Sequence, residues 1–210
     1  MRIYFIVWFY MALALKGYAQ NMTEEKAWKL GLNYGQASQN RFPLDNRNYI
    51  YNNTYFKAQI NYTFLKKHKL SYELHIEPSI YFSTHRLLNE DFITPDNYPD
   101  YLRQREVFTQ ERTFNEYVIN LGLIVRYEVF QDFSTYAIGS VGPMISGAET
   151  ERLKKGFAFS DIIGLGLSYQ VRKVLLDLRT TLRHNSNANL FKPNFGHNSF
   201  GVEYGMVYSF

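Results

Sequence analysis

The chain has 210 residues and a formal net charge of +4, a length that suits one domain of ordinary size. It contains no cysteine, which excludes disulfides, thiolate metal sites and thiol nucleophiles. Aromatic residues make up 18% and charged residues 20%, which does not suit a disordered chain. No apolar run reaches the roughly 18 residues of a membrane-spanning helix, so a polytopic helical membrane protein is excluded. A soluble β-rich domain or a membrane barrel remains, because a barrel alternates apolar with polar residues.

The N-terminus predicts a signal peptide over residues 1–19. Arg2 precedes an apolar run from Ile3 to Leu15, and small residues at Gly17 and Ala19 favour cleavage after Ala19. The alternative is a buried N-terminal helix or strand. Cleavage would remove two of the 23 basic residues, so the mature charge is 21 minus 19, or +2. So small an excess, without a basic cluster, does not indicate a nucleic-acid partner.

Alternation of apolar and polar residues with period two is the main signal along the remaining chain. It predicts eight strands, at 28–34, 56–64, 70–82, 117–129, 135–145, 157–170, 174–182 and 200–210. Most of them, with flanking residues, run to about 10–14 residues, and a tilted strand needs about 9–11 residues to cross a bilayer.

The predicted connections alternate in length. Short ones lie at 65–69, 131–134 and 171–173, and long ones at 36–54, 84–115, 146–156 and 187–196. Short turns at one end and long loops at the other are typical of an outer-membrane barrel with a periplasmic N-terminus. The terminal Phe210 resembles the recognition end of such barrels. The sequence therefore predicts an all-β fold over residues 20–210, an eight-stranded antiparallel transmembrane β-barrel in the bacterial outer membrane.

Polar residues on the opposite faces of these strands should fill the lumen, because an eight-stranded barrel is just wide enough for side chains. The expected interior set is Glu73, His75, Glu77, Arg126, Glu128, Asp177, Arg179 and Glu203. The rival is a soluble lipocalin-like barrel with apolar residues inside. The many aromatic residues on the presumed outer faces weigh against it.

Polar residues in phase with the lipid-facing set are the informative exceptions, since ionisable groups on that face cost free energy. Extending the outward parity of three neighbouring strands places Asp161, His184, Ser186 and Asn198 on the outer wall, near the long loops. His184 and Ser186 are two positions apart and share a face. This pattern suggests a serine nucleophile activated by histidine, with a third group orienting the imidazole. The alternative is a polar rim where the barrel meets water.

Residues 183–198 resemble the motif of the lipid A 3-O-deacylase (PagL-type) family, which is close to His-x-Ser-Asn-Ala, a short spacer and Pro-Asn-x-Gly. The matching residues here are His184, Ser186, Asn187, Ala188, Pro193, Asn194 and Gly196. The segment 159–167 also looks like the sixth strand of that family. The resemblance covers about 40 residues, and it implies an outer-membrane esterase that removes the 3-hydroxyacyl chain from the 3-position of lipid A.

The same resemblance implies Ser186 as the nucleophile and His184 as the base. The best-known members of that family carry Glu fourteen positions after the histidine, where this chain has Asn198. An Asn can accept the imidazole N–H but cannot supply the charge, and the acid-to-amide change in a serine protease costs about 10⁴ in rate. Asp161 is the alternative acid, whereas Glu203 has inward phase. The expected oxyanion donors are Asn187, Asn194 and the backbone near Gly196.

We expect lipid A or lipopolysaccharide as substrate, outer-membrane lipids as surroundings, and neither a metal nor a cofactor. A non-catalytic barrel (adhesin or structural) and an outer-leaflet phospholipase are the alternatives. The sequence leaves open the acyl-chain preference, whether the chain forms a homodimer, and the role of the loop at 84–115.

Overall fold

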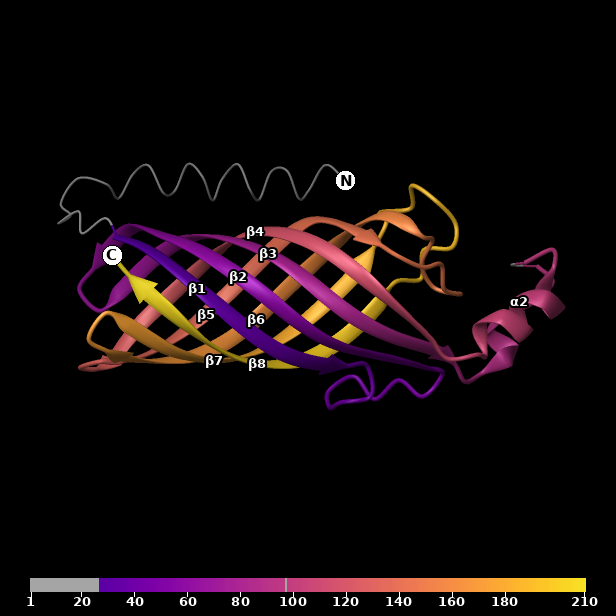
Figure 1. Cartoon of the computed structure of the whole chain (residues 1–210), viewed down its shortest axis with the longest axis horizontal. Helices are drawn as coiled ribbons and strands as arrows, with labels where there is room; N and C mark the ends of the chain where they lie inside the picture. The colour runs from indigo at the N-terminus through magenta and orange to yellow at the C-terminus, as the bar shows by residue number, and fades with distance from the viewer. Residues whose placement is uncertain (1–26, 97) are drawn as a thin grey trace.

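A closed antiparallel barrel forms the fold, and each strand pairs with its neighbours in chain order until β8 returns to β1. The computed structural model describes residues 27–96 and 98–210, so the predicted signal peptide lies outside the described residues. Within them the strands are β1 (Ala27–Ser38), β2 (Tyr49–Lys67), β3 (Leu70–Leu87), β4 (Arg112–Phe130), β5 (Phe133–Ser146), β6 (Gly156–Val171), β7 (Val174–Ser186) and β8 (His197–Ser209). The predicted fold class is confirmed (Figure 1).

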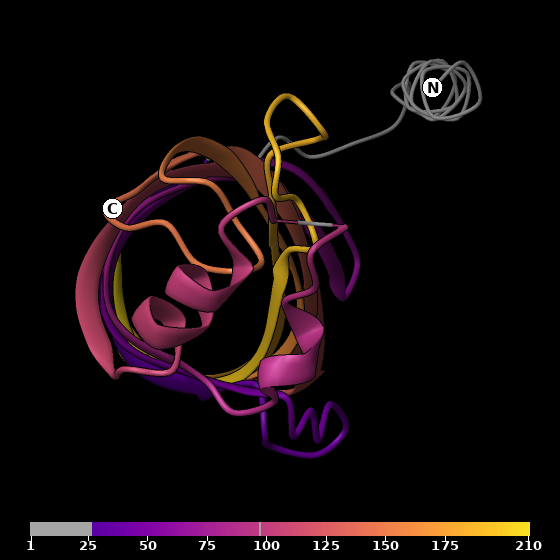
Figure 2. The same cartoon turned by 90° about the vertical axis from the view of Figure 1, so that its right-hand side faces the viewer.

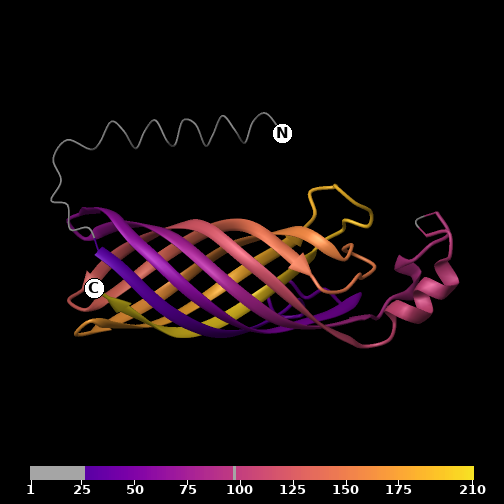
Figure 3. The ribbon, with the colours of Figure 1, turned by 45° about the horizontal axis from the view of Figure 1, so that its top comes forward.

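The two ends of the barrel differ as expected. Turns of two residues follow β2, β4 and β6 at one end, the short-turn end, which also holds the C-terminus. Longer loops gather at the other, the long-loop end, and Figure 3 shows the same division from a second direction. His68, Asp132 and Arg172 in the short turns have positive φ, the left-handed conformation that tight hairpins require.

The strands are longer than the alternation predicted, with 19 residues in β2 and β4 and 18 in β3. The predicted loop at 36–54 shrinks to 39–48, and the loop at 84–115 shrinks to 88–111. Many of the extra residues are polar on both faces, because the strands continue past the apolar band, so the alternation there is too weak to mark them. The long loop carries a short 3₁₀ helix, η1 (Glu90–Phe92), and α2 (Tyr101–Phe108), which lie at the mouth of the barrel (Figure 2). Neither helix within 27–96 and 98–210 is long and apolar enough to cross a membrane.

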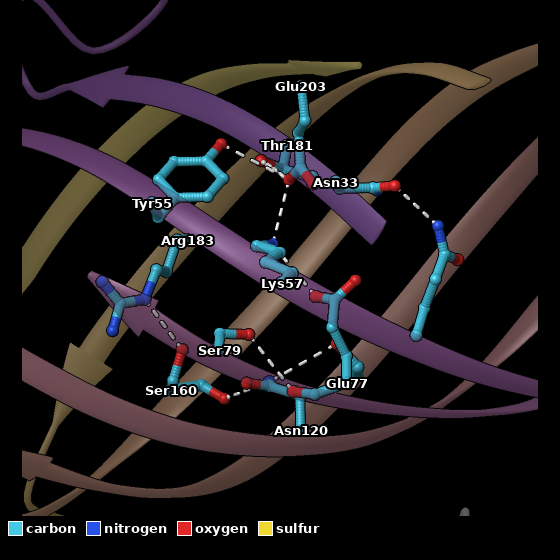
Figure 4. A network of polar contacts seen from close by, with 12 residues as sticks. Asn33, Tyr55, Lys57, Glu77, Ser79, Asn120, Ser160, Thr181, Arg183 and Glu203 are labelled. Carbon is cyan, nitrogen blue, oxygen red and sulfur yellow. Dashed lines mark hydrogen bonds and ion pairs between the residues drawn. The ribbon is translucent and has the colours of Figure 1, made fainter. Parts of the chain in front are cut away.

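Apolar side chains face outward and polar ones fill the lumen, the reverse of the lipocalin-like rival. Leu32, Ile163, Leu165 and Met206 are each more than 60% exposed on the outer wall. Inside, Glu77 and Glu203 are fully buried and held by Lys57 and Arg179, with Lys57 Nζ 3.0 Å from each carboxylate (Figure 4).

The predicted interior set is buried except Glu128, which lies near the short-turn end and is exposed there. A second buried group joins Glu73 to Lys29 and Arg126, at 2.6 and 2.8 Å. Such pairing satisfies charges that would otherwise be costly to bury. The lumen is therefore a polar plug, packed largely with buried charged side chains that are paired with one another.

Candidate active site

Three polar side chains lie in one row across the outer wall near the long-loop end. Asp161 of β6 is opposite His184 of β7, and His184 is opposite Asn198 of β8. Asp161 and Asn198 are exposed and His184 is partly exposed. Their inward-facing neighbours, such as Asn185 and His197, are buried. Strand phase therefore directs these three side chains away from the lumen, as the alternation predicted.

The His184 imidazole has one defined partner. Its Nδ1 lies 2.7 Å from Oδ1 of Asn198. An amide oxygen only accepts hydrogen bonds, so Nδ1 carries the proton, and in the neutral ring the lone pair is on Nε2. Among residues 27–96 and 98–210, no other side chain bonds to His184. The ring is thus held in the tautomer of a general base, with the basic nitrogen available.

Ser186 is the last residue of β7 and lies on the same outward face as His184, opposite Phe159 of β6. Two strand residues separate their Cα atoms by about 6.7 Å. Within the described chain, no hydrogen bond joins Ser186 Oγ to the imidazole. Catalytic hydrogen bonds often form only when substrate is bound, and this spacing lets a side-chain rotation bring Oγ toward Nε2.

Asp161 occupies the predicted position but makes no direct bond to the imidazole. Within the described residues there is no ion pair between Asp161 and His184 at 4.0 Å or less. Asn198, and not Asp161, is therefore the group that contacts Nδ1. Asp161 contributes a carboxylate on the neighbouring strand, directly opposite His184.

The loop 187–196 directly follows Ser186, and its predicted oxyanion residues bond within it. The backbone N–H of Asn187 donates to Asn194 Oδ1 at 2.7 Å, and the Asn187 amide donates to the carbonyl oxygens of Phe191 and Pro193. The Asn194 amide donates to Asn189 Oδ1 at 3.2 Å. These asparagines therefore shape the loop.

Gly196 packs against the imidazole itself. Its φ is +73°, and a Cβ there would lie 2.8 Å from His184 Cε1 and 2.6 Å from the Asn185 carbonyl oxygen. Only glycine fits both the conformation and the space. Its N–H donates to the Arg152 carbonyl oxygen at 3.1 Å, and Arg152 Nε donates back to the Gly196 carbonyl oxygen at 2.7 Å.

Two features of the loop lay beyond sequence reasoning. Arg152 fastens it from the neighbouring loop, with its guanidinium over the rings of Tyr49 and Phe92 at 4.6 and 5.1 Å. Ala188 has φ +52°, and Asn189 follows at +64°, in a turn closed by Leu190 N–H to the Asn187 carbonyl oxygen at 3.0 Å. A left-handed alanine is uncommon and costs free energy.

The described residues contain no group of three or more His, Asp or Glu side chains that could hold a metal ion. The chemistry available in this row is that of an imidazole base beside a hydroxyl.

Comparison with known proteins identifies relatives by sequence and by fold. The family described as lipid A 3-O-deacylase (PagL) matches residues 13–207. The crystal structure of the outer membrane enzyme PagL superimposes with a TM-score of 0.55 at 12% identity, covering 84% of this chain and 97% of that one.

Neisserial surface protein A (NspA) aligns with a TM-score of 0.49 at 12% identity, covering 91% of this chain and all of that one. No curated protein matches the sequence. The matched family and the PagL structure are those of an outer membrane enzyme, and this chain, a closed eight-stranded barrel, is an outer membrane β-barrel as well. Because the family match extends over nearly the whole chain, the protein belongs to the lipid A 3-O-deacylase (PagL) family.

Proposed function

We propose that the protein is a serine esterase of the outer membrane, which hydrolyses the ester of the 3-hydroxyacyl chain at the 3-position of lipid A. The observation that carries the proposal is the 2.7 Å contact of His184 Nδ1 with Asn198 Oδ1 on a lipid-facing wall. That contact leaves Nε2 as a base on the face that also carries Ser186. Family membership supports lipid A as the substrate.

In the first step, His184 Nε2 takes the proton of Ser186 Oγ, and the oxygen attacks the ester carbonyl carbon. The tetrahedral intermediate collapses, the imidazolium protonates the departing sugar 3-oxygen, and an acyl-Ser186 ester remains. His184 then activates a water molecule, which releases the hydroxy fatty acid and restores Ser186. Asn198 holds the imidazole in orientation, and Asp161 supports the imidazolium charge from one ladder position away.

The oxyanion needs donors near Ser186. We assign this role to the loop 187–196, with the backbone N–H of Ala188 as one donor. Ala188 lies two residues beyond Ser186 in a left-handed conformation, and its N–H has no partner within the described part of the chain. Backbone strain of this kind is often retained at functional sites. The amide of Asn194 and the backbone near Gly196 are further donors if the loop adjusts on binding.

An outward site suits a lipid substrate. A membrane lipid approaches the barrel sideways, with its acyl chains against the wall. Ser186 ends β7 beside an extracellular loop, so it lies near the depth of the headgroups, where the ester bonds are. A lumenal site would be closed to this substrate, because the polar plug fills the interior.

The test is mass spectrometry of lipid A from cells that express the native chain or the Ser186→Ala variant. The native chain should remove one 3-hydroxyacyl group and the variant none. Unchanged lipid A from correctly inserted native protein would favour the non-catalytic barrel. Loss of acyl chains from phospholipid, with lipid A unchanged, would instead identify an outer-leaflet phospholipase.

A further inference from the structure

An apolar groove of about 660 Å³ runs across the outer wall, with lining residues on strands from β1 to β6, and β6 is the neighbour of β7, which carries His184 and Ser186. Ala58, Pro78, Ile119 and Pro143 line it along one ladder row, and Phe56, Tyr117 and Phe157 line it on the side of the long loops. Its lining is almost wholly apolar. Since it opens on the lipid-facing wall, acyl chains are the molecules that reach it.

Two prolines create the hollow. The ladder between β2 and β3 is interrupted between the pairs Lys57↔Ser79 and Ile60↔Ile76, at the position of Pro78. The ladder between β4 and β5 is interrupted in the same way between the pairs Val118↔Met144 and Leu121↔Val141, at Pro143. Proline has no N–H to donate to a ladder, so it is seldom found inside a closed sheet. Here both breaks fall within one groove.

Inward-facing side chains form hydrogen bonds with backbone carbonyl oxygens near the two interruptions. Ser79 Oγ donates to the carbonyl oxygen of Glu77 at 3.2 Å, and Asn120 Nδ2 donates to that of Ser160 at 2.9 Å (Figure 4). Asn120 reaches from β4 past β5 to β6, at the point where Gly142 approaches Ile119 so closely that a Cβ would lie 1.9 Å from its oxygen. The groove is therefore a preformed feature of the wall.

The groove leads to the candidate nucleophile along the ladder. Pro143 is opposite Phe159, and Phe159 is opposite Ser186. Two strand spacings give about 10 Å between Pro143 and Ser186, and the four spacings from β2 to β6 give about 19 Å. An acyl chain spans about half of a 30 Å hydrocarbon core, or about 15 Å, which the groove can accommodate.

Phe159 lies between the groove and Ser186, and Phe157, at the edge of the groove, packs against it with ring centroids 5.1 Å apart in an edge-to-face pair. The chain whose ester is attacked would have to cross both rings to enter. We propose that the groove instead holds a second, non-scissile acyl chain of the same substrate lipid, so that it selects multiply acylated lipids over single-chain esters. This inference rests on the proposed function of Ser186.

A groove-filling substitution tests the proposal in the full-length barrel. Ala58→Phe fills the groove, and Ala137→Phe adds the same ring to an outward position of β5 outside it. With purified lipid A, Ala58→Phe should raise KM about fivefold or more with kcat nearly unchanged, because association in lipid depends on close packing. Hydrolysis of p-nitrophenyl butyrate should not change. Ala137→Phe should match the native chain in both assays.

A second measurement does not need turnover. In a Ser186→Ala background, native mass spectrometry measures how much lipid A, or the single-chain lipid lysophosphatidylethanolamine, each barrel retains. Ala58→Phe should lose lipid A and Ala137→Phe should keep it. Equal retention by both variants, or equal retention of the two lipids by the unfilled groove, would overturn the proposal.

Heat-modifiable mobility on gels verifies that each barrel is folded. If Ala58→Phe does not fold, Ile119→Phe serves as a second variant that fills the groove. Failure of the native chain to hydrolyse any ester would reject the proposed function alone. In that case the retention experiment still decides whether the groove binds lipid A.

Discussion

The lumen and the outer wall of this barrel treat polar groups in opposite ways. In the lumen, Glu203 is bonded by Lys57, Arg179 and Thr181, so its charge is fully compensated. On the wall, His184 has one partner at Nδ1 and none at Nε2 within the described chain. Saturated partners stabilise a structure, whereas an unsatisfied nitrogen beside a hydroxyl can move a proton. The difference indicates that the function of a polar residue in a barrel follows from the hydrogen-bond partners it has, and not from how many polar residues lie near it.

The largest effects should separate these two regions. His184→Gln removes the base and should reduce lipid A deacylation by about 10⁴-fold or more, with little change in barrel stability because His184 is at the surface. Glu203→Gln leaves two buried cations without full compensation and should lower the free energy of unfolding by about 3–5 kcal/mol. The folded fraction of that variant should keep its activity.

Urea titration in lipid vesicles measures the free energy of unfolding of both variants, which should be unchanged in His184→Gln and lower in Glu203→Gln. Lipid A mass spectrometry measures their deacylation activity. Glu128→Gln is the matched control, since Glu128 is exposed and makes no ion pair within residues 27–96 and 98–210. A Glu203→Gln barrel that is folded but inactive would place the lumen in the catalytic machinery and would contradict its purely structural role.

Substitutions at Asn198 should give the next largest effect. Asn198→Ala removes the acceptor of the Nδ1–H, frees the tautomer and should lower the deacylation rate about 10–100-fold. Asn198→Glu adds a charge that favours imidazolium and should raise the rate above that of the native chain, within the roughly 10⁴-fold bound set by acid-to-amide exchange in a serine protease. Initial rates with purified lipid A compare the three proteins. A rate for Asn198→Ala equal to the native rate would remove Asn198 from the mechanism.

Much of this arrangement followed from strand phase. Alternation gave the barrel, and carrying its parity past Leu182 and Phe200 placed His184 and Asn198 on the outer wall. Parity fixes a face but not a rotamer, so it could not decide whether Asn198 or Asp161 would contact the imidazole. The left-handed Ala188 was also beyond reach, since alanine gives no local signal for positive φ and the surrounding loop imposes it.

The smallest effect should come from Asp161, and it tests whether the outer wall works by contact or by charge. Asp161 lies opposite His184 without a direct bond, so it acts only through the field of its carboxylate. Asp161→Asn should therefore lower the deacylation rate about threefold to tenfold, an effect that falls as salt screens the charge. In an Asn198→Glu background the same substitution should matter less, because the contacting carboxylate then supplies the charge. A loss near 10⁴-fold in the native background would instead make Asp161 the acid of the triad, with Asn198 a bystander.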